Sequence, residues 1–231
     1  MPTVYLIPSY LFDPSPETLS PAVLPAVQDC SVFFVENERS ARRFLKSIWK
    51  EMVIDNYSWF TIHKAEAEVQ AAFRQVLKEG KNIGIISEAG CPGVADPGQL
   101  LVQTAHAAGA KVKPLVGPSS ILLALMASGM NGQQFRFVGY LPIDNGQRAK
   151  VIKDLEADAR KNNCTQLFIE TPYRNQQLLE TLLKTCQPDS RLCIASDITA
   201  PDEFIRTLSI REWKQQAPAL HKRPTIFCLI S

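Results

Sequence analysis

The segment from residue 84 to residue 98 constrains the fold of this chain more than any other. Its apolar start, which ends at Ile86, is followed by Ser-Glu-Ala-Gly-Cys-Pro-Gly, and an Asp-Pro-Gly turn at 96–98 then precedes a helical pattern. A buried strand, a glycine-rich loop and a helix in this order form ligand crevices at the carboxyl ends of strands in open α/β sheets. Such turn residues also make strand-to-helix connections that bind nothing, so the loop alone leaves both interpretations open.

The composition of this loop indicates a preformed backbone. Gly90 and Gly93 can adopt a positive φ or let a ligand approach the main chain closely. Pro92 and Pro97 stiffen the segment and so lower the cost of holding it open. A second turn, Gly-Pro-Ser-Ser at 117–120, precedes another apolar helical pattern. Its serines either cap that helix or, with the helix dipole, receive a carboxylate or a phosphate.

Strand and helix patterns alternate along the chain. Strands are predicted at 4–7, 31–35, 59–63, 83–86, 111–116, 135–140, 166–170, 191–196, 203–209 and 225–230. Helices are predicted at 17–27 (interrupted by two prolines and expected as short turns), 40–49, 65–78, 99–108, 121–127, 147–160, 175–184 and 210–216. The last three strands enclose a single helix, which is typical of a mixed sheet. We therefore predict an α/β chain with an N-terminal domain at 1–116 and a C-terminal mixed α/β domain at 117–231.

Composition excludes several classes of protein. The chain has 231 residues, of which 45% are hydrophobic and 21% charged, and no apolar run reaches the ~18 residues that a membrane span needs. Its start has no basic region, so no signal peptide is expected. The six cysteines show no CxxC pair or zinc-binding spacing, which predicts reduced thiols, no metal site and a cytoplasmic location. Since the net charge is only +2, nucleic-acid binding would need a local basic patch.

The common catalytic motifs are also absent. The sequence contains no GxGxxG, GxxxxGK[ST], HExxH or GxSxG motif, so dinucleotide, P-loop, zinc-protease and hydrolase functions lose their usual support. The three histidines show no recognisable triad arrangement, and nucleophilic catalysis by a loop serine is not expected.

Four segments, taken together, resemble a known family. They are residues 86–98, 114–120, 135–142 and 168–174, and they occur in the family's order. The chain resembles the tetrapyrrole methylase superfamily, which uses S-adenosylmethionine, and is most similar to the branch that methylates a ribose 2′-hydroxyl of 16S ribosomal RNA. The similarity covers nearly the whole chain.

The chain departs from that branch at three loops. Residues 8–13 lack the glycine and asparagine of the branch's Pro-Thr-Pro-Ile-Gly-Asn-Leu, and residues 36–39 replace Glu-Asp-Thr-Arg with Glu-Asn-Glu-Arg. Residues 88–92 replace Asp-Ala-Gly-Thr-Pro with Glu-Ala-Gly-Cys-Pro. We also expect the chain to be shortened at its C-terminus. The segments that face the cofactor therefore match better than those that face the substrate.

The resemblance implies a two-domain α/β homodimer that holds S-adenosylmethionine in the cleft between the domains. Its cofactor-binding positions, carried over to matching residues, include Cys91 and Val94 in the first loop and Ser120 and Ile121 in the second. The full set implied is Ser87, Gly90, Cys91, Pro92, Val94, Ser119, Ser120, Ile121, Glu170 and Thr225. The last two lie at or near strand ends and are expected to be peripheral contacts.

A hydroxyl acceptor would also have to lose a proton, which requires a general base. Glu36 and Glu38 come directly after a predicted strand, where the chemistry of α/β proteins usually lies, although acidic residues there are often only solvated. His63 is more often a buried, hydrogen-bonded histidine than a base, and Glu170 is the remaining candidate. The catalytic residue therefore stays unassigned.

The leading functional hypothesis is a methyltransferase that acts on ribosomal RNA or on the small ribosomal subunit. Basic clusters at 39–50, 148–153 and 222–223 are the sites where RNA phosphates would bind. One alternative is methylation of a small, tetrapyrrole-like molecule in an apolar cleft. Another is a non-catalytic relative that binds cofactor or RNA. No membrane partner is expected.

Overall fold

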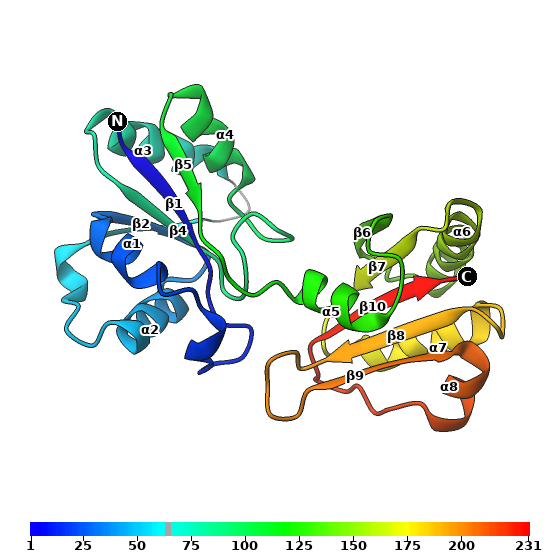
Figure 1. Cartoon of the computed structure of the whole chain (residues 1–231). Helices are drawn as coiled ribbons and strands as arrows, with labels where there is room; N and C mark the ends of the chain where they lie inside the picture. Colours follow the sequence, from blue (N-terminus) through cyan, green and yellow to red (C-terminus); the bar gives the residue numbers. More distant parts are fainter. Residues whose placement is uncertain (63–65) are drawn as a thin grey trace. The chain divides into compact units, whose positions relative to one another are not determined.

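A computed structural model describes residues 1–62 and 66–231. The chain forms two compact units, Met1–Ser119 and Ser120–Ser231, which are described separately (Figure 1). The sequence placed the division after residue 116, and the compact units divide after Ser119. Among the described residues, no helix is both long and apolar enough to cross a lipid bilayer.

The first unit is a five-stranded parallel sheet with helices on both faces. Its elements are β1 (Thr3–Ile7), η1 (Pro16–Thr18), α1 (Val23–Asp29), β2 (Val32–Val35), α2 (Glu38–Ile48), η2 (Ile54–Asn56), β3 (Ser58–Thr61), α3 (Glu66–Lys78), β4 (Ile83–Ile86), α4 (Gln99–Ala107) and β5 (Lys111–Pro114). The strand order is β3-β2-β4-β1-β5, and each neighbouring pair is parallel. The prediction of a mostly parallel N-terminal sheet is confirmed.

The segment at 17–27 is divided into short pieces, as its two prolines led us to expect, and the structure gives their bounds. A 3-10 turn covers Pro16–Thr18, and α1 begins only at Val23. Pro25 is tolerated inside α1 because it lies in the first turn, where a backbone N–H would have no acceptor within the helix.

Alternate strand residues of the first unit bury opposite faces of its sheet. Tyr5 and Ile7 pack with Phe33 in the cluster that contains the buried residues of α1 and α2. Val4 and Phe34 instead pack in the cluster that contains α3 and α4. Burial on both faces explains why these strands are almost continuously apolar.

The strand order creates a topological switch point between β1 and β4. These strands are neighbours, but the chain leaves β1 for α1 on one face of the sheet and leaves β4 for α4 on the other face. Connections that diverge in this way leave a crevice at the carboxyl ends of the two strands, where open α/β sheets bind their ligands. The crevice edge therefore consists of the segment after Ile7 and the segment after Ile86.

The second unit is a mixed sheet of order β6-β7-β10-β8-β9. Its elements are α5 (Ser120–Ser128), β6 (Phe135–Tyr140), α6 (Asn145–Asn162), β7 (Thr165–Ile169), α7 (Asn175–Thr185), β8 (Arg191–Ser196), β9 (Phe204–Ser209), α8 (Ile210–Gln216) and β10 (Thr225–Ile230). β6 and β7 are parallel, and the other neighbours are antiparallel. The predicted mixed C-terminal sheet is thus confirmed.

The core of the second unit lies between this sheet and the helices α6, α7 and α8. Trp213 on α8 is fully buried there, and its indole N–H donates to the carbonyl of Leu192 at 2.8 Å. The remaining helix, α5, packs against β8, β9 and β10. The outer residues Leu122 and Met126 of α5 are exposed, by 50% and 78%.

Candidate functional site

Three segments of the first unit meet at the carboxyl ends of β1, β4 and β5, which are adjacent in the sheet. We call residues 8–11, 87–98 and 115–118 the three-loop junction. Ser9 joins the first two segments: its backbone N–H donates to the carbonyl of Gly90 at 2.9 Å, and its hydroxyl donates to the carbonyl of Ser87 at 3.1 Å. The first segment, although it lacks the glycine and asparagine of the related branch, is thereby fixed to the glycine-rich loop.

The third segment is held just as closely. The thiol of Cys91 donates to two backbone carbonyl oxygens, that of Pro118 at 3.3 Å and that of Gly117 at 3.8 Å. A Cβ atom at Gly117 would lie only 2.2 Å from Cβ of Pro8, so only glycine fits there. The two predicted turns therefore converge within the first unit.

The outer part of the glycine-rich loop is open. Gly90 and Gly93 have φ values of 78° and 77°, as their predicted role in the turn requires. A Cβ atom at Gly93 would meet no atom within 4 Å, and the neighbouring Val94 is 49% exposed. A glycine beside an exposed apolar side chain offers space and a nonpolar contact, which suits the flat face of a nucleoside.

Three carboxylates gather at this loop, two of them from the loop itself. Glu36, directly after β2, accepts the backbone N–H of Glu88 at 3.0 Å, and Glu88 accepts the hydroxyl of Ser40 at 3.3 Å. Burial raises the pKa of Asp96 to about 6; the charges of Glu36 and Glu88 also raise it, and a hydrogen bond from Ser87 opposes them. Asp96 is therefore an acid–base group that titrates close to neutral pH.

Sequence reasoning named Asp96 only as part of a turn and did not consider it as a base. The available signal was one acidic residue directly after a strand and two in the loop after another, but the pairing of β2 with β4, which brings them together, was not predicted. Within residues 1–62 and 66–231, no group of three or more His, Cys, Asp or Glu side chains is arranged to hold a metal ion.

Cys91 is an unreactive thiol in this setting. Burial raises its pKa above the ordinary value, and the nearby charge of Asp96 raises it further. Since the thiolate is the nucleophilic form, a packing or lining role suits Cys91 better than chemistry.

The remaining predicted cofactor residues lie in the second unit, apart from Ser119, which ends the first. α5 starts at Ser120, and the next residue of the helix, Ile121, is buried, with 7% of its surface exposed. Thr225 starts β10, and its buried hydroxyl lies 3.0 Å from that of Ser196.

Glu170, directly after β7, is tightly held. One oxygen of its carboxylate accepts the backbone N–H of Thr171 at 2.6 Å and the guanidinium of Arg174 at 2.7 Å. Burial alone would raise the pKa of Glu170, but the hydrogen bonds from Arg174 and Thr171 and the charges of Arg174 and Arg148 outweigh it, and the pKa is lowered. With its side chain only 1% exposed, Glu170 is placed to hold the turn that follows it.

The other base candidates differ in their surroundings. Glu36 keeps one oxygen on a backbone N–H of the loop, whereas Glu38 forms an ion pair with Arg42. His63 lies outside the described residues.

The predicted basic clusters are only partly available to a partner. On α2, Arg42 pairs with Glu38, Arg43 pairs with Asp13 at 3.1 Å, and Lys46 donates to the carbonyl of Met52 at 3.0 Å. The cluster at 148–153 needs a correction, because the side chain of Arg148 is fully buried.

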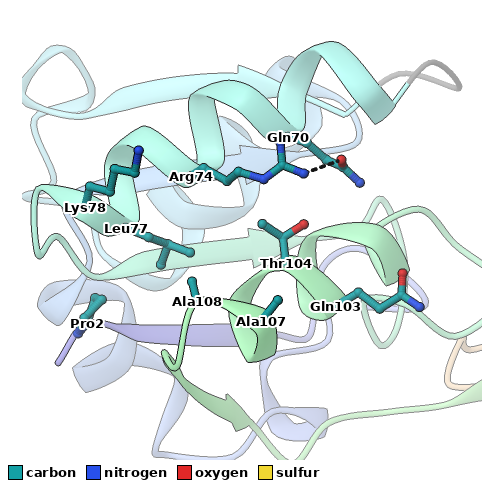
Figure 2. Close-up of a pocket in the computed structure, with 9 residues that line it drawn as sticks. All are labelled: Pro2, Gln70, Arg74, Leu77, Lys78, Gln103, Thr104, Ala107 and Ala108. Carbon is teal, nitrogen blue, oxygen red and sulfur yellow. Dashed lines mark hydrogen bonds between the residues drawn. The ribbon is translucent and has the colours of Figure 1, made fainter.

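A hollow of about 620 Å³ lies between α3 and α4 (Figure 2). Arg74 and Lys78 border it on α3, Ala107 and Ala108 at the end of α4, and Pro2 just before β1. Because Pro2 precedes β1, this hollow lies at the amino ends of the parallel strands. The three-loop junction lies at their carboxyl ends, and it is the better candidate for the site.

Comparisons with known proteins identify the family. The family model described as Tetrapyrrole (Corrin/Porphyrin) Methylases matches residues 14–214. The chain is 32% identical over 195 residues to "Ribosomal RNA small subunit methyltransferase I" of Mesorhizobium japonicum, covering 84% of this chain and 61% of that protein. It is 37% identical over 131 residues to the protein of the same name in Bacillus subtilis, covering 56% and 43%. The chain spans 54% and 50% of the length of two further relatives of this name, from Buchnera aphidicola and Vibrio cholerae.

Solved structures share the fold at lower sequence identity. Diphthine synthase superposes with a TM-score of 0.69 at 14% identity, covering 100% of this chain and 90% of that one. Uroporphyrin-III C-methyl transferase from Thermus thermophilus, complexed with S-adenyl homocysteine, superposes with a TM-score of 0.58 at 18% identity, covering 99% and 97%. Fold, motifs and family model together show that the chain belongs to the tetrapyrrole (corrin/porphyrin) methylase family.

Proposed function

We propose that this protein transfers the methyl group of S-adenosylmethionine to a ribose 2′-hydroxyl of small-subunit ribosomal RNA. The observation that carries the proposal is the three-loop junction, where the thiol of Cys91 and the backbone of Pro118 tie two glycine–proline turns together at a switch point. Relatives named as ribosomal RNA small subunit methyltransferases support the acceptor. A structure of the same fold that holds S-adenyl homocysteine supports the cofactor.

The residues of the junction fit such a cofactor. Open space at Gly93 and the exposed side chain of Val94 would receive its adenosyl group. Ser87, Gly90, Cys91 and Pro92 would form the surrounding wall, together with Ser119, which directly follows the junction. S-adenosylmethionine supplies an already activated methyl group on a sulfonium. The protein's part is then to align the acceptor and exclude water, and alignment of this kind can supply about 7–11 kcal/mol of the barrier.

The same site provides a group that can take the proton of the acceptor hydroxyl. Asp96 has a pKa raised to about 6 by burial and by the charge of Glu36, so that its carboxylate is both present and more basic than usual at neutral pH. General bases work best when their pKa lies near the working pH. We assign proton removal to Asp96, with Glu36 as the residue that raises its basicity.

Transfer of labelled methyl groups tests the proposal. Small ribosomal subunits that lack the modification are incubated with the protein and labelled cofactor, beside a tetrapyrrole precursor. We expect label in the RNA at a ribose, resistant to alkaline cleavage at that position. Label in the tetrapyrrole alone would show that the acceptor is a small molecule and not RNA. A protein that binds the cofactor but labels neither substrate would be a non-catalytic relative.

Two substitutions test the assignment of the base. Asp96→Asn is expected to lower kcat by about 10²- to 10⁴-fold, the usual contribution of a positioned base, with cofactor affinity retained. Glu36→Gln should lower the pH at which activity rises, because it removes a charge that raises the pKa of Asp96. An unchanged kcat in Asp96→Asn would return the role to Glu36, Glu38 or His63.

We also propose that the protein works as a homodimer in the cytoplasm, where its ribosomal substrate would be found. The exposed apolar side chains of Leu122 and Met126, four residues apart on α5, support a protein contact. Analytical ultracentrifugation should show a dimer that Met126→Asp shifts toward monomer.

A further inference from the structure

Two segments of the second unit meet beside the end of β7. The backbone N–H of Lys222 donates to the carbonyl of Pro172 at 3.0 Å, and the side chain of Asn175 donates to the carbonyl of Arg223 at 2.6 Å. The turn at 171–174 is closed by a bond from the N–H of Arg174 to the carbonyl of Thr171 at 2.9 Å. Its conformation is therefore set before any partner arrives.

This turn holds an aromatic side chain out in solvent. Tyr173 is 70% exposed, and its ring lies 6.3 Å from the exposed imidazole ring of His221, at an angle of 74°. Supported at its edge by the imidazole, the ring of Tyr173 presents a flat surface on which a base can stack.

The charged groups around Glu170, directly before this turn, are positive on balance. Arg148 is fully buried and its guanidinium donates only to neutral groups among the described residues, with Nε and Nη1 left without a partner. Glu170 is the nearby carboxylate, and it is already paired with Arg174. The guanidinium groups of Arg148 and Arg174 and the carboxylate of Glu170 together carry one excess positive charge. Because Arg148 is buried, water screens the field of this charge only weakly.

Lys222 adds a second positive charge in an unusual backbone conformation. Its φ is 62°, a left-handed value that is costly for a residue with a side chain. The N–H bond to Pro172 holds it there, and its side chain remains exposed. Strained residues of this kind are enriched at functional sites. By contrast, Arg223 is balanced within the chain, since it donates to the carboxylate of Asp197.

We propose that Tyr173, His221 and Lys222 form a surface that binds single-stranded RNA, with one unpaired base stacked on Tyr173 and a phosphate on Lys222. This inference rests on the proposed RNA acceptor and adds how the RNA is held. An aromatic plane beside cations fits a splayed nucleotide better than a duplex, because bases in a duplex are stacked on one another.

Fluorescence anisotropy with the full chain tests the surface. The probe is a labelled, unstructured 12-nucleotide RNA, with the same sequence in a duplex as comparison. Tyr173→Ala should weaken binding of the single strand by about 5- to 150-fold, the range for one lost stacked base, and Tyr173→Phe should retain it. Lys222→Gln should reduce the slope of log affinity against log salt by about 0.7, the value for one phosphate on a single strand.

Matched controls come from the opposite end of the same unit. Phe135 starts β6 and is 41% exposed, and Lys184 is exposed in the last turn of α7. Phe135→Ala and Lys184→Gln should leave RNA affinity unchanged. Circular dichroism of each variant shows whether weaker binding comes from a lost contact or from a lost fold. Tyr173→Phe keeps the aromatic ring and so tests stacking without removing the side chain.

The outcomes separate this inference from the proposed function. If the wild type methylates small subunits but Tyr173→Ala binds the RNA as well as the wild type does, the surface is wrong and the function stands. If RNA binding depends on Tyr173 but no methyl reaches RNA, the function is wrong and the surface stands. Loss of S-adenosylmethionine affinity in Tyr173→Ala, or Tyr173-dependent binding of a poly-glutamate peptide in preference to RNA, would overturn the surface in favour of another ligand.

Discussion

Replacing Asp96 with asparagine should stabilise the first unit at alkaline pH while it removes the proposed base. The carboxyl group of Asp96 is partly buried beside Glu36 and Glu88, and its pKa is raised from 3.8 to about 6. Asparagine has nearly the same shape and can still accept the hydrogen bond from Ser87, but it carries no charge to repel its neighbours. Function and stability should therefore change in opposite directions.

The sign and size of the effect follow from proton linkage. Between about pH 4 and pH 6 the folded chain holds a proton on Asp96 that the unfolded chain has released, so the folded state loses stability as the pH rises through this window. Two pKa units correspond to about 3 kcal/mol. Because Asp96 is partly exposed, solvent screening reduces this, and we expect about 1–2 kcal/mol.

Chemical denaturation of wild type and Asp96→Asn at pH 4 and at pH 8 measures the difference. The variant should equal the wild type at pH 4 and be more stable by the stated amount at pH 8. An NMR titration of the Asp96 carboxyl carbon should in parallel show a midpoint near pH 6. A stability difference that is the same at both pH values, or a midpoint near 4, would refute the electrostatic reasoning.

Three further predictions concern packing and reactivity. Gly117→Ala would place a methyl group 2.2 Å from the ring of Pro8. The substitution should displace the third segment of the junction and lower kcat/KM by about 100-fold. Near-normal kinetics would show that the junction is not the cofactor site. Gly84→Ala would place its methyl group 2.7 Å from a buried phenyl ring and should lower the free energy of unfolding by about 1–3 kcal/mol, whereas Gly132→Ala, where a Cβ meets no atom within 4 Å, should change it little. At neutral pH, iodoacetamide should label Cys91 more slowly than a free thiol such as glutathione because the pKa of Cys91 is raised; rapid labelling followed by mass spectrometry would contradict this.

Much of the local structure was readable in the sequence. The strands at 135–140, 191–196 and 225–230 and the helix at 210–216 have the predicted bounds. These elements depend on the spacing of apolar residues and on nearby turn residues, which interact within a few positions of one another. At 17–27 the expected interruption into short pieces was found, but their bounds were not predicted, because the effect of a proline depends on where in a helix it lies.

The sequence by itself also determined the composition of the site. The glycines and prolines of the loop from 87 to 98 and of the turn at 117–118 follow from the conformations that these residues permit. Their order along the chain was enough to indicate the family, since the resemblance depends on motifs and not on contacts.

Only the tertiary structure decided which groups meet. β4 lies between β1 and β2, so Ser9 reaches the loop after β4 and the charge of Glu36 acts on Asp96. Likewise, the sequence predicted that Arg148 is a surface cation, but its side chain is buried near Glu170. Strand order and burial depend on packing between residues far apart in sequence, and a pKa depends on the charges and solvent that this packing places around a group.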